Sequence, residues 1–184
     1  YPDITYSFYP VYADLFDLKE IKVPLNENFE IEIEKYFGLD GHIIITNPNA
    51  PTSIALKLEE IEKIAEKNPN QLIVVDEAYV DFGAESAVKL VNKYDNVFVV
   101  QTFSKSRSFA GMRLGYAIGS ENTIEGLNRL KFSFNSYTID KISIEAGIES
   151  FKDDDYFIKI NAKIIETRKK TVKKLKELEF NGME

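Results

Sequence analysis

The chain has 184 residues, 44% of them hydrophobic, which is enough apolar material for one well-packed core. Acidic residues outnumber basic ones by 30 to 23, and the net charge of −7 argues against nucleic acid, which is bound mainly through its phosphates. Cysteine is absent and His42 is the only histidine, so a disulfide framework is excluded and a thiolate or histidine metal site is implausible. We therefore expect a small-molecule ligand and a cytoplasmic location.

The termini and the hydropathy pattern give two further expectations. No apolar run reaches the length of a membrane span, so we expect no membrane-embedded segment. The first residues, Tyr-Pro-Asp-Ile, are neither an initiator nor a signal peptide, so we expect the chain to begin inside a longer protein.

Short apolar runs recur along the chain and predict strands. In chain order they cover residues 21–25, 42–46, 72–75, 97–100 and 115–118. Several runs are continuous rather than alternating, which is typical of strands covered on both faces in a mostly parallel sheet.

Helical patterns lie between and after these runs. Apolar residues recur at helical spacing from 58 to 65, and Asn-Pro-Asn at 68–70 ends that helix. A second helix is expected after Ser120, which suits an N-cap, and one long helix from Asp155 to about Glu179, with a solvated lysine- and arginine-rich face. The alternation of strands and helices predicts an α/β fold.

Polar clusters follow three successive predicted strands. They are Asn-Pro-Asn-Ala-Pro-Thr-Ser at 47–53, Asp-Glu-Ala-Tyr at 76–79, and Ser-Lys at 104–105, which runs on to Arg113. In open α/β sheets the ligand crevice lies beyond the carboxyl ends of the strands. We therefore expect these clusters to converge on one pocket that holds an acid, a lysine and an arginine.

In this order and at these intervals, the clusters resemble those of the pyridoxal-phosphate (PLP) dependent fold-type I aminotransferases. Residues 5–9 (Thr-Tyr-Ser-Phe-Tyr) and 75–79 (Val-Asp-Glu-Ala-Tyr) resemble the histidinol-phosphate aminotransferase branch, and the likeness spans nearly the whole chain. Each motif alone is a weak signal, whereas all of them in order are a strong one. The resemblance implies a PLP cofactor and a three-layer α/β/α fold with a mostly parallel sheet.

The resemblance also implies a role for each polar residue. Lys105 would attack the cofactor aldehyde as a neutral amine, and Asp76 would keep the pyridine nitrogen protonated. Tyr79 would donate its hydroxyl to the phenolic oxygen of the cofactor. Ser104 and Arg113 would hold its phosphate, which suits a planar guanidinium fork. Without the family context, the lysine and arginine read as surface residues and the tyrosine as a core aromatic.

Two of these roles have alternative residues nearby. Tyr6 would stack on the pyridine ring, with Tyr9 and Tyr12 as nearby candidates. Glu77 follows Asp76 directly, but opposite faces of a strand end cannot both meet one ring nitrogen, and the family pattern selects Asp76.

One departure from the family pattern lies in the first cluster. The family places asparagine immediately before the Pro-Thr pair, where Ala50 stands here. Asn49 is the neighbouring substitute for binding the cofactor, and a turn-forming role is the alternative for it. Ser53 replaces the usual glycine, which is a milder change.

The family also carries segments that we do not find in the sequence. These are an N-terminal glycine-rich turn and a C-terminal small domain with an arginine for the acidic group of the substrate. We therefore expect residues 1–152 to be an incomplete PLP-binding large domain and residues 153–184 a long helix leading to the small domain. The resemblance implies that the parent protein is a homodimer and that this fragment is inactive.

The leading functional hypothesis is transamination between L-histidinol phosphate and 2-oxoglutarate, in histidine biosynthesis. Threonine-phosphate decarboxylase and aspartate or aromatic aminotransferases share the same key residues and stay open as alternatives. Two other classes are a Ser-Lys hydrolase that uses Ser104 and Lys105, and a non-catalytic domain that does not bind PLP. P-loop and Rossmann nucleotide sites are excluded because their glycine-rich motifs are absent from the sequence.

Overall fold

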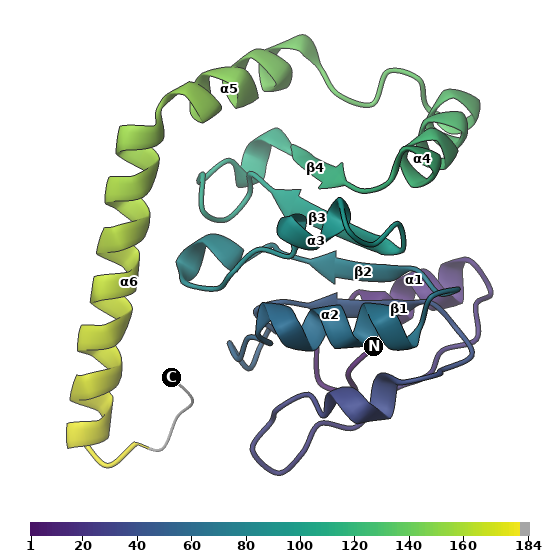
Figure 1. Ribbon diagram of the computed structural model, residues 1–184. Coiled ribbons are helices and arrows are strands. Elements are labelled where there is room, and N and C mark those ends of the chain that lie inside the picture. The colour runs from purple at the N-terminus through teal and green to yellow at the C-terminus, as the bar shows by residue number, and fades with distance from the viewer. Residues whose placement is uncertain (181–184) are drawn as a thin grey trace.

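The computed structural model describes residues 1–180, which contain a four-stranded sheet. Its strands are β1 (Ile43–Thr46), β2 (Ile73–Asp76), β3 (Val97–Thr102) and β4 (Gly115–Ile118), in that spatial order. β1, β2 and β3 are parallel, and β4 pairs antiparallel with β3 (Figure 1). The mostly parallel α/β sheet expected from the sequence is confirmed.

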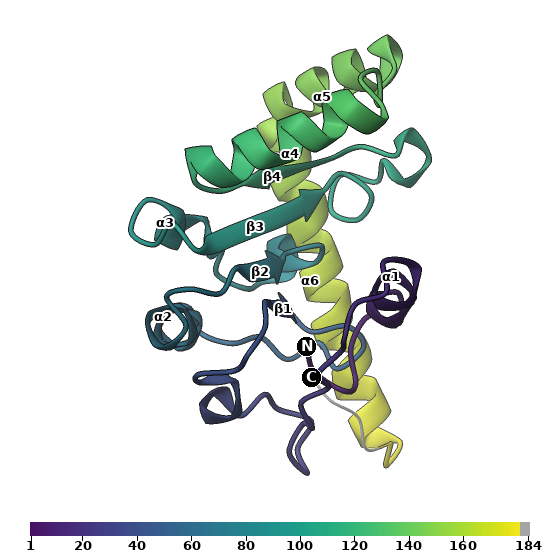
Figure 2. The ribbon, with the colours of Figure 1, turned by 90° about the vertical axis from the view of Figure 1, so that its right-hand side faces the viewer.

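Six α-helices and three short 3-10 helices are present in the described residues. The α-helices are α1 (Tyr9–Leu15), α2 (Leu58–Lys67), α3 (Val88–Val91), α4 (Glu121–Phe134), α5 (Lys141–Lys152) and α6 (Asp154–Glu177). The 3-10 helices are η1 (Ile33–Tyr36), η2 (Val80–Phe82) and η3 (Ala110–Met112). Figure 2 shows α2 and α3 on one side of the sheet and α1 on the other, which gives the expected three layers.

The core lies where the continuous apolar strands meet α2. Ile45, Val75 and Val99 are fully buried in β1, β2 and β3, and the apolar stripe of α2 packs on the same cluster through Ile61 and Ile64. Burial of branched side chains on neighbouring parallel strands supplies most of the stabilisation here, because it removes apolar surface from water. The core therefore fixes the strand ends from which the polar clusters project.

The helix boundaries follow the local sequence signals. α2 ends at Asn68, whose buried side-chain amide donates to the Tyr36 and Ile64 carbonyl oxygens at 2.9 and 2.8 Å. Ser120 caps α4 by accepting a hydrogen bond from the Thr123 backbone N–H, as its position in the sequence predicts.

The strand predicted at residues 21–25 was wrong, and one helix was not predicted. Residues 21–25 form no strand, and only Val23 makes an isolated bridge, to Pro2. Pro24 cannot donate a ladder hydrogen bond, which shortens the pairing. α5 is a separate helix that the sequence pattern did not reveal, because the residues it buries are Ser143 and Gly147 rather than an apolar stripe.

The expected long C-terminal helix is α6, one residue longer at its start and about two shorter at its end. Figure 1 shows it beyond the side of the sheet toward which the parallel strands point. It contacts η2, and the Arg168 guanidinium donates to the Phe82 carbonyl oxygen at 3.1 Å. The apolar face continues to Leu175 and Leu178, which are exposed in this structure. None of the helices described is long and apolar enough to span a bilayer.

Candidate functional site

The three parallel strands that precede the polar clusters end at one edge of the sheet. Thr46, at the end of β1, pairs in register with Asp76 at the end of β2, and Asp76 pairs with Val100 in β3. The Asn47 backbone N–H continues the ladder by donating to the Asp76 carbonyl oxygen at 2.8 Å. The side chains that follow β1, β2 and β3 therefore share one edge, which is the location where α/β sheets bind ligands.

Asp76 is half-buried and its two carboxylate oxygens have different partners. Oδ2 accepts from the Tyr9 hydroxyl at 2.8 Å, and Oδ1 accepts from the Ala78 backbone N–H at 3.1 Å. Each carboxylate oxygen offers about two acceptor positions, so the carboxylate keeps capacity for a further donor.

Glu77 points into a different environment. It is only 2% exposed and accepts from the Ser86 hydroxyl, the Ala87 backbone N–H and the Gln101 side-chain amide at 2.7, 2.5 and 2.6 Å. Burial raises the pKa of its carboxyl. Glu77 thus ties the end of β2 to β3 and to the turn before α3, so Asp76 is the carboxylate that is left for a ligand.

Lys105 follows β3 in a loop, residues 103–114, that we call the lysine loop. Its Nζ lies 5.1 Å from the centre of the Tyr79 ring, and among the described residues it forms no ion pair and no hydrogen bond with Ser104. The buried Ser106 hydroxyl donates to Asp81, and this bond ties the lysine loop to the turn that carries Tyr79. The arrangement joins Lys105 to Tyr79 and gives no support to a Ser-Lys hydrolase.

Ser104 and Arg113 lie at the two ends of the lysine loop. The Phe103 backbone N–H closes the loop by donating to the Leu114 carbonyl oxygen at 3.1 Å. Ser104 directly follows Phe103, and Arg113 directly precedes Leu114. Arg113 has a positive φ of 51° and an exposed side chain whose guanidinium donates to the Ala110 carbonyl oxygen at 3.0 Å. One guanidinium N–H group is therefore used within the lysine loop, and the other donors of this exposed side chain are open to solvent.

Asn49 is 3% exposed and its amide is used within the protein. Its Nδ2 donates to the Ile4 carbonyl oxygen at 3.0 Å and to the Thr52 hydroxyl at 3.2 Å. Its Oδ1 accepts from the Thr5 hydroxyl at 2.7 Å. Since both N–H groups already have acceptors, the geometry favours the turn-forming role of Asn49 over direct cofactor binding.

Ala50 lines a cavity of about 420 Å³. Tyr79 lies on its wall together with Ile164 and Arg168 of α6. The short side chain of Ala50 therefore opens space beside Tyr79, where the family pattern places an asparagine.

The tyrosines of residues 6–12 have three different environments. The Tyr6 ring is half exposed and meets the Tyr9 ring edge-on, with 5.6 Å between centroids. Tyr9 is buried and its hydroxyl engages Asp76, whereas Tyr12 is exposed and packs on Phe8. Tyr6 and Tyr12 are about equally exposed, but of the two only Tyr6 contacts the Tyr9 ring that binds Asp76, so Tyr6 is the better-placed stacking ring. Tyr9 has another role.

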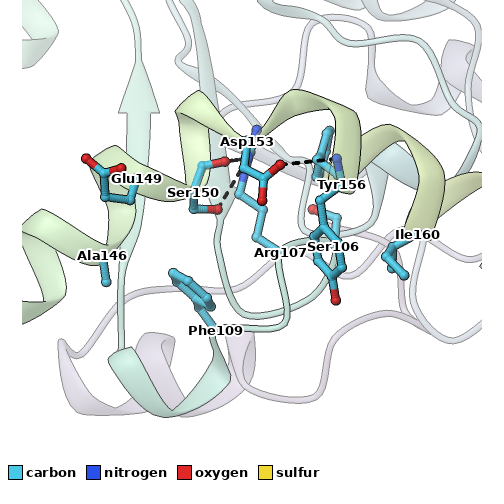
Figure 3. A pocket seen from close by; sticks show the side chains of 10 residues that line it. Ser106, Arg107, Phe109, Ala146, Glu149, Ser150, Asp153, Tyr156 and Ile160 are labelled. Atoms are coloured by element: carbon cyan, nitrogen blue, oxygen red, sulfur yellow. Dashed lines mark hydrogen bonds between the residues drawn. The ribbon is translucent and has the colours of Figure 1, made fainter.

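A second cavity, of about 320 Å³, lies where the lysine loop meets α5 and α6 (Figure 3). Arg107 projects into this junction and donates to the Ser150 carbonyl oxygen at 2.6 Å. Its guanidinium lies 4.3 and 4.0 Å from the centres of the Phe151 and Phe157 rings. The cavity contains none of the residues predicted to bind the cofactor. No sequence pattern predicted the contacts of Arg107.

The residues at the sheet edge fit a PLP cofactor. Asp76 offers an unpaired acceptor position for a protonated ring nitrogen. Lys105 forms no ion pair with a carboxylate among the described residues. Ser104 and Arg113 add hydroxyl and guanidinium donors of the kind that hold a phosphate dianion. No group of three or more histidine, aspartate or glutamate side chains that could hold a metal ion occurs within residues 1–180.

Comparisons with known proteins find relatives that match over the whole chain. A model of the aminotransferase class I and II family matches residues 1–184. The histidinol-phosphate aminotransferase of Brachyspira hyodysenteriae is 58% identical over 185 residues, which cover all of this chain and 52% of that protein. The chain spans about half the length of the curated relatives it matches.

Solved structures share the fold at lower identity. The histidinol-phosphate aminotransferase from Clostridium acetobutylicum has a TM-score of 0.85 at 24% identity, over 94% of this chain and 54% of its own. The enzyme from Sinorhizobium meliloti in complex with pyridoxal-5'-phosphate has a TM-score of 0.81 at 22% identity, over 90% of this chain and 46% of its own.

Proposed function

The chain belongs to the aminotransferase class I and II family, and from this membership and the geometry of the sheet edge we propose that it forms the cofactor-binding part of a PLP-dependent aminotransferase. The observation that carries the proposal is the placement of Lys105 over Tyr79, at the same sheet edge as the Asp76 carboxylate. An amine, a hydroxyl-bearing ring and a carboxylate are the groups that the cofactor needs around its aldehyde, phenolic oxygen and ring nitrogen.

In this proposal each residue has a defined role. Asp76 holds the proton of the ring nitrogen, and Lys105 supplies the amine that attaches the cofactor and then moves a proton at the substrate Cα. Tyr79 donates to the phenolic oxygen, and Ser104 and Arg113 hold the phosphate. PLP itself supplies an electron sink for the negative charge that develops at that carbon.

We assign L-histidinol phosphate and 2-oxoglutarate as the amino donor and acceptor of the whole protein. The support is the 56–58% identity to histidinol-phosphate aminotransferases over nearly the whole chain. On the same grounds we propose that the whole protein is a cytoplasmic homodimer. Residues 1–152 would belong to its large domain, and 153–184 would lead to a small domain.

Borohydride reduction of the protein in the presence of PLP, followed by peptide mass spectrometry, tests the attachment site. We expect a phosphopyridoxyl group on Lys105 that is absent from a Lys105→Ala variant and retained by Lys163→Ala, which removes an exposed lysine from α6. The experiment should use both the 184-residue chain and the full natural chain that contains it. Labelling spread over many surface lysines, or absent from both proteins, would refute the assignment.

The substrate assignment needs a separate measurement on the full natural chain. We expect kcat/KM for L-histidinol phosphate to exceed those for aspartate and for aromatic amino acids by at least about 100-fold, because a site built for a phosphate rejects donors that leave its cations unpaired. Release of carbon dioxide from threonine phosphate would instead support the decarboxylase alternative.

A further inference from the structure

Tyr9 is the buried neighbour of Asp76, and the resemblance assigned it no role beyond that of a possible stacking ring. Its side chain is 7% exposed, and its hydroxyl has two partners. Asp76 Oδ2 and Thr46 Oγ1 both lie 2.8 Å from it. A buried tyrosine hydroxyl with two such partners is a fixed part of the site rather than a free polar tip.

The direction of these hydrogen bonds can be worked out. An ionised carboxylate only accepts, so the Tyr9 hydroxyl donates to Asp76 and its oxygen is left to accept from the Thr46 hydroxyl. Burial, and then the neighbouring Asp76 charge, raise the pKa of Tyr9 above its ordinary value, which keeps its proton in place. Tyr9 is therefore a permanent donor toward Asp76.

The Tyr9 ring is held before any ligand arrives. It contacts the Tyr1 and Tyr6 rings, with centroids 5.8 and 5.6 Å away. Thr46, which donates to it, ends β1 and is 2% exposed. Because the hydroxyl is positioned by packing, little conformational entropy is lost when Asp76 uses it.

We propose that Tyr9 is a positioning residue of the cofactor site: its hydroxyl orients the Asp76 carboxylate so that the unpaired acceptor position of that carboxylate meets the ring nitrogen. This inference rests on the proposed PLP-binding function. With one oxygen held by Tyr9 and the other by the Ala78 backbone N–H, the carboxylate is fixed from two sides. A carboxylate that is already oriented in this way loses little conformational entropy when it binds a protonated nitrogen.

A Tyr9→Phe substitution in the full natural chain tests the role because it removes the hydroxyl and keeps the ring contacts. We expect the dissociation constant for PLP, measured by equilibrium dialysis, to rise on the order of tenfold, the size of one hydrogen bond to a charged group. The absorption band of the bound cofactor should also change. Tyr12→Phe is the matched control, because Tyr12 is an exposed residue of the same helix, and should change neither quantity.

A double-mutant cycle with Asp76→Asn separates positioning from packing. If Tyr9 acts through Asp76, Tyr9→Phe should alter neither the PLP affinity nor the absorption band further in the Asp76→Asn background. An equal loss of affinity in both backgrounds, or no loss in either, overturns the inference while leaving PLP binding intact. Failure of the wild-type protein to bind PLP would instead remove the proposed function and this inference together.

Discussion

At the scale of single residues, the consecutive carboxylates Asp76 and Glu77 differ because successive side chains at a strand end point to opposite faces. Asp76 faces the ligand edge, where Tyr9 donates to it. Glu77 faces inward and accepts three hydrogen bonds from Ser86, Ala87 and Gln101. A pair of adjacent acids thus supplies one group for a ligand and one that holds the loop following β2.

Glu77→Gln should lower the free energy of unfolding by about 1–3 kcal/mol at neutral pH. The Glu77 carboxylate oxygens accept from the Ala87 backbone N–H and the Gln101 amide, and in the variant an amide N–H₂ group would face one of these donors. Urea denaturation measures this change. Glu85→Gln is a suitable control, since Glu85 is exposed and forms only a surface ion pair with Lys89. Equal effects of the two substitutions would contradict the role given to Glu77.

The same variant predicts a pH dependence of stability. Burial raises the pKa of Glu77 above its ordinary value of 4.5, so the folded state keeps this proton to a higher pH than the unfolded state does. The stability from this group is complete below pH 4.5 and declines as the pH rises through the raised folded-state pKa. The stability difference between wild type and Glu77→Gln should therefore narrow with rising pH over that range, and a widening difference would argue against it.

The positions of the strand ends could be predicted from the sequence, but the side-chain contacts at that sheet edge could not. The strand pattern placed Asp76, Tyr79 and Lys105 after successive strands, and parallel pairing makes such positions converge. The contact between Tyr9 and Asp76 joins residues 67 positions apart and depends on how α1 packs, which no local pattern encodes. The engagement of Asn49 with Ile4 and Thr5 was hidden for the same reason.

At the scale of elements, the fold was predictable wherever the buried face is apolar. The strands β1, β2 and β3 and helix α2 bury branched aliphatic residues, and the apolar pattern of these segments reveals it. α5 instead buries Ser143 and Gly147, so its packing face carries no hydropathy signal. In residues 21–25 the apolar pattern was present, but Val23 is the only residue there that is buried.

Alanine substitutions at two glycines should change the stability of the protein in opposite directions. A Cβ on Gly115 would lie 2.9 Å from the Gln101 carbonyl oxygen, so Gly115→Ala forces β3 and β4 apart and should destabilise the protein by about 1–3 kcal/mol. A Cβ on Gly126, in exposed α4, meets nothing within 4 Å. Gly126→Ala should stabilise by about 1 kcal/mol through helix propensity. Opposite shifts of the urea midpoint would confirm the pair, and shifts of the same sign would contradict it.

At the scale of the whole molecule, two arginine side chains, Arg107 and Arg168, connect the region of α6 to the rest of the protein. Near its start, the Arg107 guanidinium lies 4.3 and 4.0 Å from the centres of the Phe151 and Phe157 rings. Arg107 also donates to the Ser150 carbonyl oxygen, and both residues are labelled in Figure 3. Further along, Arg168 donates to the Phe82 carbonyl oxygen in η2. Because Arg107 is two residues from Lys105, its contacts connect the lysine loop directly to the junction of α5 and α6.

Removing the Arg107 contacts should loosen that junction locally. Arg107→Ala deletes the hydrogen bond and both ring contacts, so amide hydrogen exchange in residues 150–160 should become about tenfold faster, the lysine loop changing with it. Arg168→Ala is the matched control, because it should accelerate exchange near residue 168 and η2 and leave residues 150–160 unchanged. Hydrogen-exchange mass spectrometry resolves these segments. A uniform rise over the whole chain in Arg107→Ala would show that Arg107 supports global stability instead of coupling the lysine loop to α6.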